Sequence, residues 1–403
     1  MERRLRAAFN KAYTPALYER LKARLEAEFC PAPFRIAETP VFLAPSLRDD
    51  VLRATREILE ELTAPEMTRR LEAVVPSEHR APGGEELPTC MTVDFAFARL
   101  EDGTVAPRVV ELQAFPSLYA LTLVQTQLWN ELLCELDGVD APLTPFFDGF
   151  DEEKYLALFR EVIVGDEDPT EVVLLDIVPD EQKTRPDFLA TEQLLGVERV
   201  CVTAVQREGR RLFRERAGRR VPIRRVYNRV VFDELFQKRP PMSFAFSDEL
   251  DVTFVPHPNW SWMWSKAVLP LLRHETVPRS TLLCDLAELP EDLSRFVLKP
   301  LFSFAGAGVN VDPTPADVDA VPREQRPHWL LQEKIDYARD LVTPEGHGVA
   351  AEIRVLCLRG PNDRVPRATS NLTRLSRGKM LGVDFNKDFD WVGSTISMWP
   401  TGS

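Results

Sequence analysis

No hydrophobic run in the 403-residue sequence approaches the roughly 20 residues that a membrane-spanning helix needs. The N-terminal segment MERRLRAAFNKAY is charged and lacks the apolar stretch of a secretory signal. We therefore expect a cytoplasmic protein that does not contact a membrane.

Cysteine and histidine are scarce and scattered. The six cysteines form no CxxC pair, and the five histidines form no HExxH motif. Several cysteines lie in apolar, strand-like runs, which is typical of buried free thiols. This distribution argues against disulfides, against zinc ligands and against thiol-based catalysis.

Positive charge is also in the minority, because 50 Lys and Arg residues face 63 Asp and Glu residues, for a net charge of −13. Such a balance argues against a general nucleic-acid-binding protein. The segment 207–225, REGRRLFRERAGRRVPIRR, is a local exception. Its glycines and interspersed glutamates favour a solvated β-hairpin arm over a patch for anionic ligands.

The pattern along the chain predicts a mixed α+β and α/β architecture. Leucines at helical spacing predict helices in 14–29 and 46–75. Further on, a strand at 171–179, a helix at 184–196 and a strand at 198–205 alternate, which indicates a small α/β unit with a parallel sheet. We expect four regions, namely an N-terminal helical region (1–88), an acidic hairpin with a helix (89–150), the small α/β subdomain (151–260) and a C-terminal region (261–403) that begins with a helix.

The second region contains a strong hairpin signal. Two strand-like runs, CMTVDFAFARL and APRVVELQAF, are joined by EDGT. If Asp102 and Gly103 are the two turn residues, Asp94 lies directly opposite Glu111. Opposed side chains are roughly 4.5–5.5 Å apart at Cβ, and Gln113 points to the same face as Glu111.

Two carboxylates and an amide oxygen on one face are hard donors, and opposed like charges need compensation. Mg²⁺ fits such a set because it prefers oxygen ligands and shares its shell with water and phosphate. The predicted metal ligands are therefore Asp94, Glu111 and Gln113. The alternatives are that the carboxylates are solvated, or that a bulge near Pro107 breaks the register.

The stretch 296–311, FVLKPLFSFAGAGVNV, places Lys299 at the end of an apolar strand and before a glycine loop. A buried lysine needs an anionic partner, and Gly306 and Gly308 allow backbone amides to approach a phosphate. We expect residues 309–311 to resume a strand. The lysine precedes the glycines and no helix follows, which excludes a P-loop and a Rossmann fingerprint. A plain hairpin and a phosphate clamp remain as the two interpretations.

Two further groups of residues suit a nucleotide. In WLLQEKI, a strand ends at Gln332, Glu333, Lys334 and Ile335, where polar and apolar positions alternate as in the lining of an adenine slot. Glu333 would read the base edge, or else these are solvated charges at a strand end. Arg354 and Arg374 add fixed positive charge for phosphate or carboxylate.

Taken together, these residues resemble the ATP-grasp ligases. That family has a lysine before a glycine-rich loop, here Lys299 and 304–309, and an acidic hinge, here LLQEKI. It also has an earlier lysine, for which Lys266 in WSWMWSK is the counterpart. The acid and E-x-N elements that usually follow the hinge lie upstream here, as VDFAFARL and VVELQAFPS. This order is similar to the circularly permuted synthetase domain of glutathionylspermidine synthases.

Two positions depart from that pattern. Gln113 replaces the asparagine of the family, which keeps the amide oxygen on a longer arm. Thr92 stands where those synthases have an arginine near the transferred phosphate, which leaves Arg354 or Arg374 as candidates for its role.

The resemblance implies an ATP-grasp fold and an ADP-forming, ATP- and Mg²⁺-dependent ligase. It would join a carboxylate to an amine or thiol through an acyl phosphate, on small-molecule or peptide substrates. A kinase with the same clamp, or a nucleotide-binding protein without turnover, are the alternatives. The implied catalytic residues are Lys299, Arg354 and Arg374, and the implied ATP contacts are Lys266, Lys299, Ser303, Ala305, Gly306, Ala307, Gly308, Gln332, Glu333, Lys334 and Ile335.

Residues for the second substrate are expected at the strand ends of the small α/β unit, where ligands usually bind. Each of them has a structural interpretation as well. The candidates are Asp176, Thr184, Arg185, Asn228 and Arg229.

Overall fold

The computed structural model describes residues 1–139, 141–303, 306–379, 381 and 386–401. Its largest sheet has the strand order β18-β17-β16-β2-β3, and β15 pairs with the first two residues of β16. Every pairing in this sheet is antiparallel. The strands are β2 (Cys90–Arg99), β3 (Val105–Gln113), β15 (Leu341–Val342), β16 (Gly348–Leu358), β17 (Arg367–Ser376) and β18 (Gly393–Thr395).

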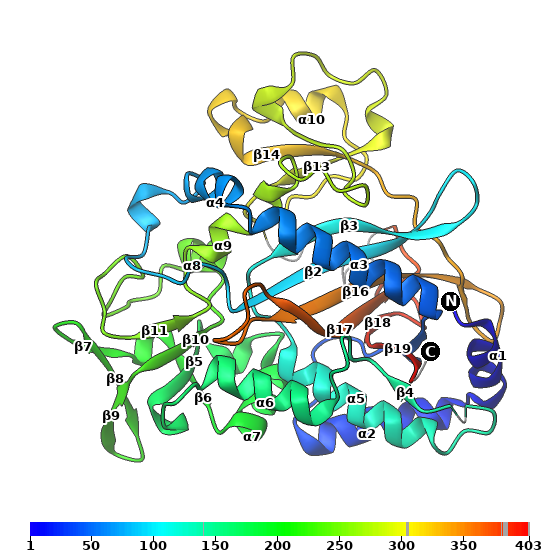
Figure 1. The fold of residues 1–403 in the computed structure, drawn as a ribbon, viewed down its shortest axis with the longest axis horizontal. Helices are drawn as coiled ribbons and strands as arrows, with labels where there is room; N and C mark the ends of the chain where they lie inside the picture. Colours follow the sequence, from blue (N-terminus) through cyan, green and yellow to red (C-terminus); the bar gives the residue numbers. More distant parts are fainter. Residues whose placement is uncertain (140, 304–305, 380, 382–385, 402–403) are drawn as a thin grey trace.

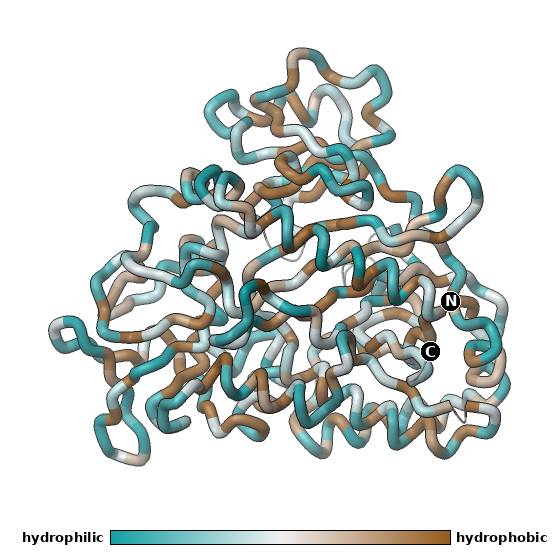
Figure 2. Tube along the Cα trace, viewed as in Figure 1, coloured by the Kyte–Doolittle hydropathy of each residue, from teal (hydrophilic) through white to brown (hydrophobic). Residues whose placement is uncertain are grey.

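One face of this sheet belongs to the hydrophobic core. Val93, Phe95 and Phe97 alternate along β2 and are at most 1% exposed. Helix α3 (Pro45–Leu62) packs on β3 and β17, while α5 (Tyr119–Leu133) and α6 (Glu152–Ile163) lie against β17 and β16 (Figure 1). Figure 2 shows hydrophobic residues along these strands and hydrophilic residues on the outer loops. The other face of β2 is left for polar side chains.

The predicted pairing of Asp94 with Glu111 is confirmed, although the turn differs from the prediction. Arg99 pairs with Val105, and the Leu100 amide donates to the carbonyl of Thr104, so residues 101–103 form a three-residue loop that closes the hairpin. One extra residue in β3, Val110, then forms a bulge that shifts the register back. The bulge therefore restores the predicted pair and frees the carbonyl of Val110 from the ladder.

The predicted parallel α/β unit is present as a sheet with the order β11-β10-β5-β6, in which all pairings are parallel. Helix α7 (Arg185–Leu195) connects β5 to β6, and α8 (Phe232–Lys238) follows β10. The strands are β5 (Val172–Asp176), β6 (Glu198–Cys201), β10 (Arg225–Asn228) and β11 (Thr253–Val255).

The arginine-rich segment forms a separate three-stranded arm, as expected for a solvated hairpin. Several of its guanidinium groups are paired with acidic side chains; Arg214 and Arg216, for example, both contact Glu198. The strands are β7 (Gln206–Glu208), β8 (Arg211–Arg216) and β9 (Arg219–Ile223).

A small lobe lies beyond β3 and carries the lysine–glycine stretch (Figure 1). Its sheet has the order β12-β14-β13, and it has its own apolar cluster around Leu298 and Leu331. The elements are β12 (Ser280–Leu282), β13 (Phe296–Pro300), α10 (Pro315–Asp319) and β14 (Trp329–Glu333).

Two predictions around this lobe are wrong. Residues 309–311 form no strand; a single bridge joins Leu298 to Asn310, because a proline follows at 313 and ends the pairing. The helix predicted from 261 shortens to α9 (Trp260–Met263) and a 3₁₀ turn at Lys266–Val268. Pro270, two residues beyond the turn, cannot continue a helix.

The N-terminal region is mostly helical, as predicted, with α1 (Arg3–Ala12), α2 (Pro15–Glu28), α3 and α4 (Pro65–Glu72). Its strand β1 (Val41–Phe42) pairs with β19 (Ser397–Pro400), which pairs with β4 (Leu143–Thr144). The two ends of the chain therefore share one sheet. None of the helices in the described part of the chain is long and apolar enough to span a membrane.

Candidate functional site

Charged side chains occupy the polar face of the large sheet. Arg354 of β16 lies opposite Asp94 of β2 and donates from Nε and Nη2 to its two oxygens at 2.7 and 2.6 Å. Arg374 of β17 donates to Asp94 Oδ2 at 2.7 Å. Asp94 is 0% exposed, so these contacts replace its lost hydration. Both predicted arginines thus share one buried carboxylate.

Two residues that the sequence interpretation missed complete this network. Glu352, which is 2% exposed, accepts hydrogen bonds from Arg374 and from the Tyr337 hydroxyl, the latter at 2.9 Å. Burial raises the pKa of Glu352, although Arg374 opposes that effect. Glu352 stands two positions before Arg354, so the two-residue period of a strand would have placed it on the same face.

Glu111 links this network to Lys266. Its carboxylate lies 3.6 Å from Lys266 Nζ and 3.8 Å from Arg354 Nη2. Burial would raise the pKa of Glu111, but Lys266, Arg354, Arg374 and Lys299 outweigh it and lower the pKa to about 2. Glu111 is therefore a firmly ionised carboxylate that faces cations.

Lys299 is buried, as predicted, but its partners are neutral oxygens. Its ammonium donates to Gln332 Oε1 at 2.6 Å and to the carbonyl freed by the Val110 bulge at 3.3 Å. Burial lowers the pKa of Lys299 to about 8, and the negative charge of Glu111 is the main effect that opposes this shift. The bulge thus connects the lobe to the hairpin at the position next to Glu111.

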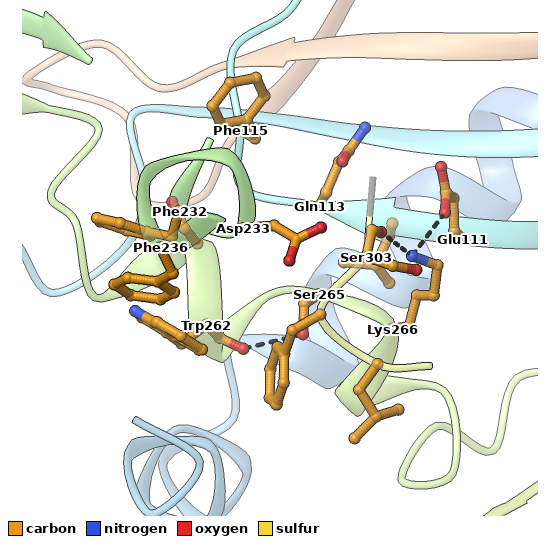
Figure 3. A pocket seen from close by; sticks show the side chains of 14 residues that line it. Glu111, Gln113, Phe115, Phe232, Asp233, Phe236, Trp262, Ser265, Lys266 and Ser303 are labelled. Atoms are coloured by element: carbon orange, nitrogen blue, oxygen red, sulfur yellow. Dashed lines mark hydrogen bonds and ion pairs between the residues drawn. The ribbon is translucent and has the colours of Figure 1, made fainter. Parts of the chain in front are cut away.

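The loop after Lys299 contacts the second lysine. The Lys266 ammonium donates to the carbonyl of Ser303 (Figure 3). Gly306 and Gly308 have φ of +76° and +72°, which other residues rarely adopt. Ala307 lies between them, while Ala305 falls outside the described residues. The loop is thus built for close backbone approach.

The hinge residues lie along the lobe. Gln332, at 1% exposure, points to Lys299, while Glu333 pairs with Phe296 at the end of β14. Lys334 forms an ion pair with Asp312 at 2.9 Å, and Ile335 follows it, half-buried. Of these four residues, Gln332 is the one for which the described structure gives a hydrogen bond to Lys299.

The five predicted second-substrate residues lie at the ends of β5 and β10 and at the start of α7. Arg229 is 2% exposed and is bound to Asp187, whose carboxylate also accepts from backbone amides at the start of α5. The side chain of Asn228 accepts from the Val230 amide. Thr184 precedes α7, and Arg185 Nε is 3.7 Å from an aspartate, Asp180. Their role with a substrate stays a prediction.

Asp176, the fifth of them, leads to a pH prediction. Burial raises the pKa of Asp176 to about 7. The pKa of an unfolded aspartate is about 4. Between pH 4 and pH 7, roughly, Asp176 is therefore protonated in the folded state and ionised in the unfolded state, so the free energy of unfolding falls as pH rises through this range. Asp176→Asn is expected to remove this decline, gaining stability relative to wild type from pH 4.5 to pH 8, as measured by urea unfolding. Parallel curves for the two proteins would refute it.

A pocket opens beside Lys266. It contains about 620 Å³ of space that no protein atom fills, part of it open to solvent. At one end lie Glu111, Gln113, Lys266 and Ser303, and at the other lie aromatic side chains (Figure 3). No group of three or more His, Cys, Asp or Glu side chains in the described part of the chain has the arrangement of a metal site.

The predicted metal ligands therefore differ in their surroundings. Glu111 and Gln113 line the pocket, whereas Asp94 is enclosed by arginines. A cation beside Glu111 and Gln113 would meet one carboxylate and one amide oxygen from the protein. Metal binding by the three residues stays a prediction.

Comparison with known proteins shows a similarity of fold. No family model and no curated protein matches the sequence. The structure of a glutathione synthetase-like effector (GSS30) from Globodera pallida, in its apo form, is similar with a TM-score of 0.56 at 11% sequence identity. The match covers 96% of this chain and 98% of that chain. This protein therefore has a mixed α+β fold similar over nearly its whole length to that of a glutathione synthetase-like protein.

Proposed function

We propose that this protein is an ATP-grasp ligase of the circularly permuted type, which joins a carboxylate to an amine or thiol with ATP and Mg²⁺. The observation that carries the proposal is the meeting of two lysines from distant segments at adjacent positions of one strand. Lys299 contacts the carbonyl of Val110, and Lys266 lies 3.6 Å from Glu111. Lys266 also donates to the carbonyl of Ser303, which precedes the glycines at 306 and 308.

In this proposal, Lys266 and Lys299 bind the phosphates of ATP, and the Gly306–Gly308 loop closes over them and excludes water. The carboxylate substrate attacks the γ-phosphorus, which gives an acyl phosphate and ADP. The amine or thiol then displaces phosphate, forms the new bond to the acyl carbon and loses a proton. Positioning and electrostatics supply the catalysis, so a nucleophilic side chain is not required.

Glu111 and Gln113 fit a Mg²⁺ shared with the phosphates, because both line the pocket and offer oxygen donors. Bound there, the ion would neutralise phosphate charge. Asp94 would join them only by exchanging a guanidinium contact for the ion. Arg354 and Arg374 are proposed to face the transferred phosphate, with Asp94 and Glu352 holding them in place.

Product analysis tests the proposal. The protein is incubated with ATP, Mg²⁺ and mixtures of carboxylates and amines, and ADP, phosphate and new amides are measured by mass spectrometry. A ligase yields one amide or thioester for each ADP. A phosphorylated product without an amide would identify a kinase instead, and the absence of ADP with every mixture would reject turnover.

A further inference from the structure

The far end of the pocket has a wall of five aromatic side chains, which we call the aromatic wall. They come from the segment after β3, from α8, from α9 and from the loop after β13, and no two of these segments are neighbours along the chain. The members are Phe115, Phe232, Phe236, Trp262 and Phe302.

Four rings of this wall, those of Phe232, Phe236, Trp262 and Phe302, pack against one another. Trp262 lies 5.7 Å from the Phe232 ring and 5.0 Å from the Phe302 ring, the latter edge-on. His79 stacks on Phe236 at 4.4 Å and is nearly parallel to Trp262 at 5.7 Å. Such contacts stabilise each ring, so the wall is ordered before a ligand arrives.

One carboxylate in front of this wall has no partner among the described residues. Asp233, in the first turn of α8, points into the pocket between Gln113 and Ser303 (Figure 3). It makes no hydrogen bond or ion pair with any residue that the structure describes, whereas the other carboxylate of the lining, Glu111, faces Lys266. The lining therefore presents one uncompensated negative charge.

Two buried polar atoms of residues that line the pocket, Ser261 Oγ and Trp262 Nε1, also lack partners within the described chain. Trp262 is 7% exposed, so water satisfies its N–H poorly. Buried donors without partners are costly unless a ligand accepts from them. A ligand that accepts a hydrogen bond from one of these atoms would remove part of that cost.

A carboxylate in front of aromatic faces is the chemistry that recognises an organic cation. The carboxylate supplies charge and hydrogen bonding, and the π-faces attract the ammonium while they cover its hydrocarbon. We propose that this pocket binds an organic ammonium with an aromatic or branched apolar body. The further assignment, that this molecule is the amine substrate, rests on the proposed ligase function.

The position of the pocket agrees with that assignment. Lys266 and Glu111 line its other end, so an ammonium at Asp233 would lie next to the phosphate clamp. The predicted adenine-binding residues, 332–335, do not line the pocket. A nucleotide base would bring no charge to pair with Asp233.

Calorimetric titration of the nucleotide-free protein with phenethylamine tests the binding. 2-Phenylethanol has the same shape without the charge and is expected to bind at least tenfold more weakly. Asp233→Asn is expected to weaken phenethylamine binding at least tenfold, and Phe236→Leu several-fold. Glu234→Gln is the matched control on the same helix, because Glu234 bonds to Gln182 and Lys238 outside the pocket. This variant should bind phenethylamine with the affinity of the wild type.

Equal binding of the alcohol and the amine, or an unchanged affinity in folded Asp233→Asn and Phe236→Leu proteins, would overturn the proposal. Competition between phenethylamine and ADP would overturn it as well, because the pocket would then be the nucleotide site. The two proposals fail separately: binding through Asp233 without amide formation rejects the ligase, whereas amide formation independent of Asp233 rejects the ammonium site.

Discussion

Replacing Lys299 by methionine is expected to weaken ATP binding by roughly 30-fold or more, since removing one partner of a buried charged contact costs about 2–5 kcal/mol. Lys299 is 8% exposed and stands beside Glu111 and Lys266 at the proposed phosphate site. Methionine keeps most of the side-chain volume, so the loss reflects the charge. The measurement is calorimetric titration with a non-hydrolysable ATP analogue and Mg²⁺.

Lys154→Met provides the control, because Lys154 is exposed on α6 and bonds only to nearby oxygens in the described structure. It should bind the analogue as the wild type does. Circular dichroism establishes that the Lys299 variant is folded. An unchanged affinity in a folded Lys299→Met protein would remove this lysine from the nucleotide site.

Replacing Asp94 by asparagine is expected to destabilise the fold by about 3–5 kcal/mol, even in buffer that contains EDTA, because the buried guanidinium of Arg354 and the half-buried guanidinium of Arg374 lose their shared carboxylate. Asp94 is 0% exposed and accepts three hydrogen bonds from Arg354 and Arg374. The measurement is the urea unfolding free energy.

The matched substitution on the same hairpin is Asp102→Asn, in the exposed turn. It should leave the unfolding free energy close to that of wild type. The contrary result is an Asp94→Asn protein whose unfolding free energy equals that of wild type without metal and falls below it only when Mg²⁺ is present. Asp94 would then be a metal ligand and not an anchor for the arginines.

Local sequence patterns were sufficient to predict that Asp94 faces Glu111, but not to predict the turn and the bulge that bring the two residues together. The Asp-Gly signal predicted a two-residue turn, and the structure has a three-residue loop. The bulge at Val110 compensates for that difference, so Asp94 still faces Glu111. A bulge depends on the tertiary contacts of the bulged residue, here with Lys299, which no window of the hairpin contains.

The arginine network depends on pairing between segments far apart in the sequence. Arg354 meets Asp94 because β16 pairs with β2, and 260 positions separate the two residues. Sequence periodicity places a residue on a face of its strand but does not choose the neighbouring strand. The charges of Arg354 and Arg374 were therefore predicted as functional, while their shared partner was not.

The aromatic wall was not predicted for the same reason. The sequence around Phe232, Asp233 and Phe236 indicates only a helix after a strand. The tryptophans before Lys266 fit packing between domains at least as well as stacking on a ligand. Only the folded chain brings α8, α9 and the loop after Lys299 around one pocket. That Asp233 has no hydrogen-bond or ion-pair partner among the described residues is likewise a property of the fold.

The most direct test of the proposed function is a crystal structure with a non-hydrolysable ATP analogue and Mg²⁺. The prediction is that the terminal phosphate lies within hydrogen-bonding distance of Lys266 and Lys299, with the metal bound by Glu111 and Gln113 and the base beside 332–335. A nucleotide bound elsewhere, or no nucleotide at millimolar concentration, would contradict it.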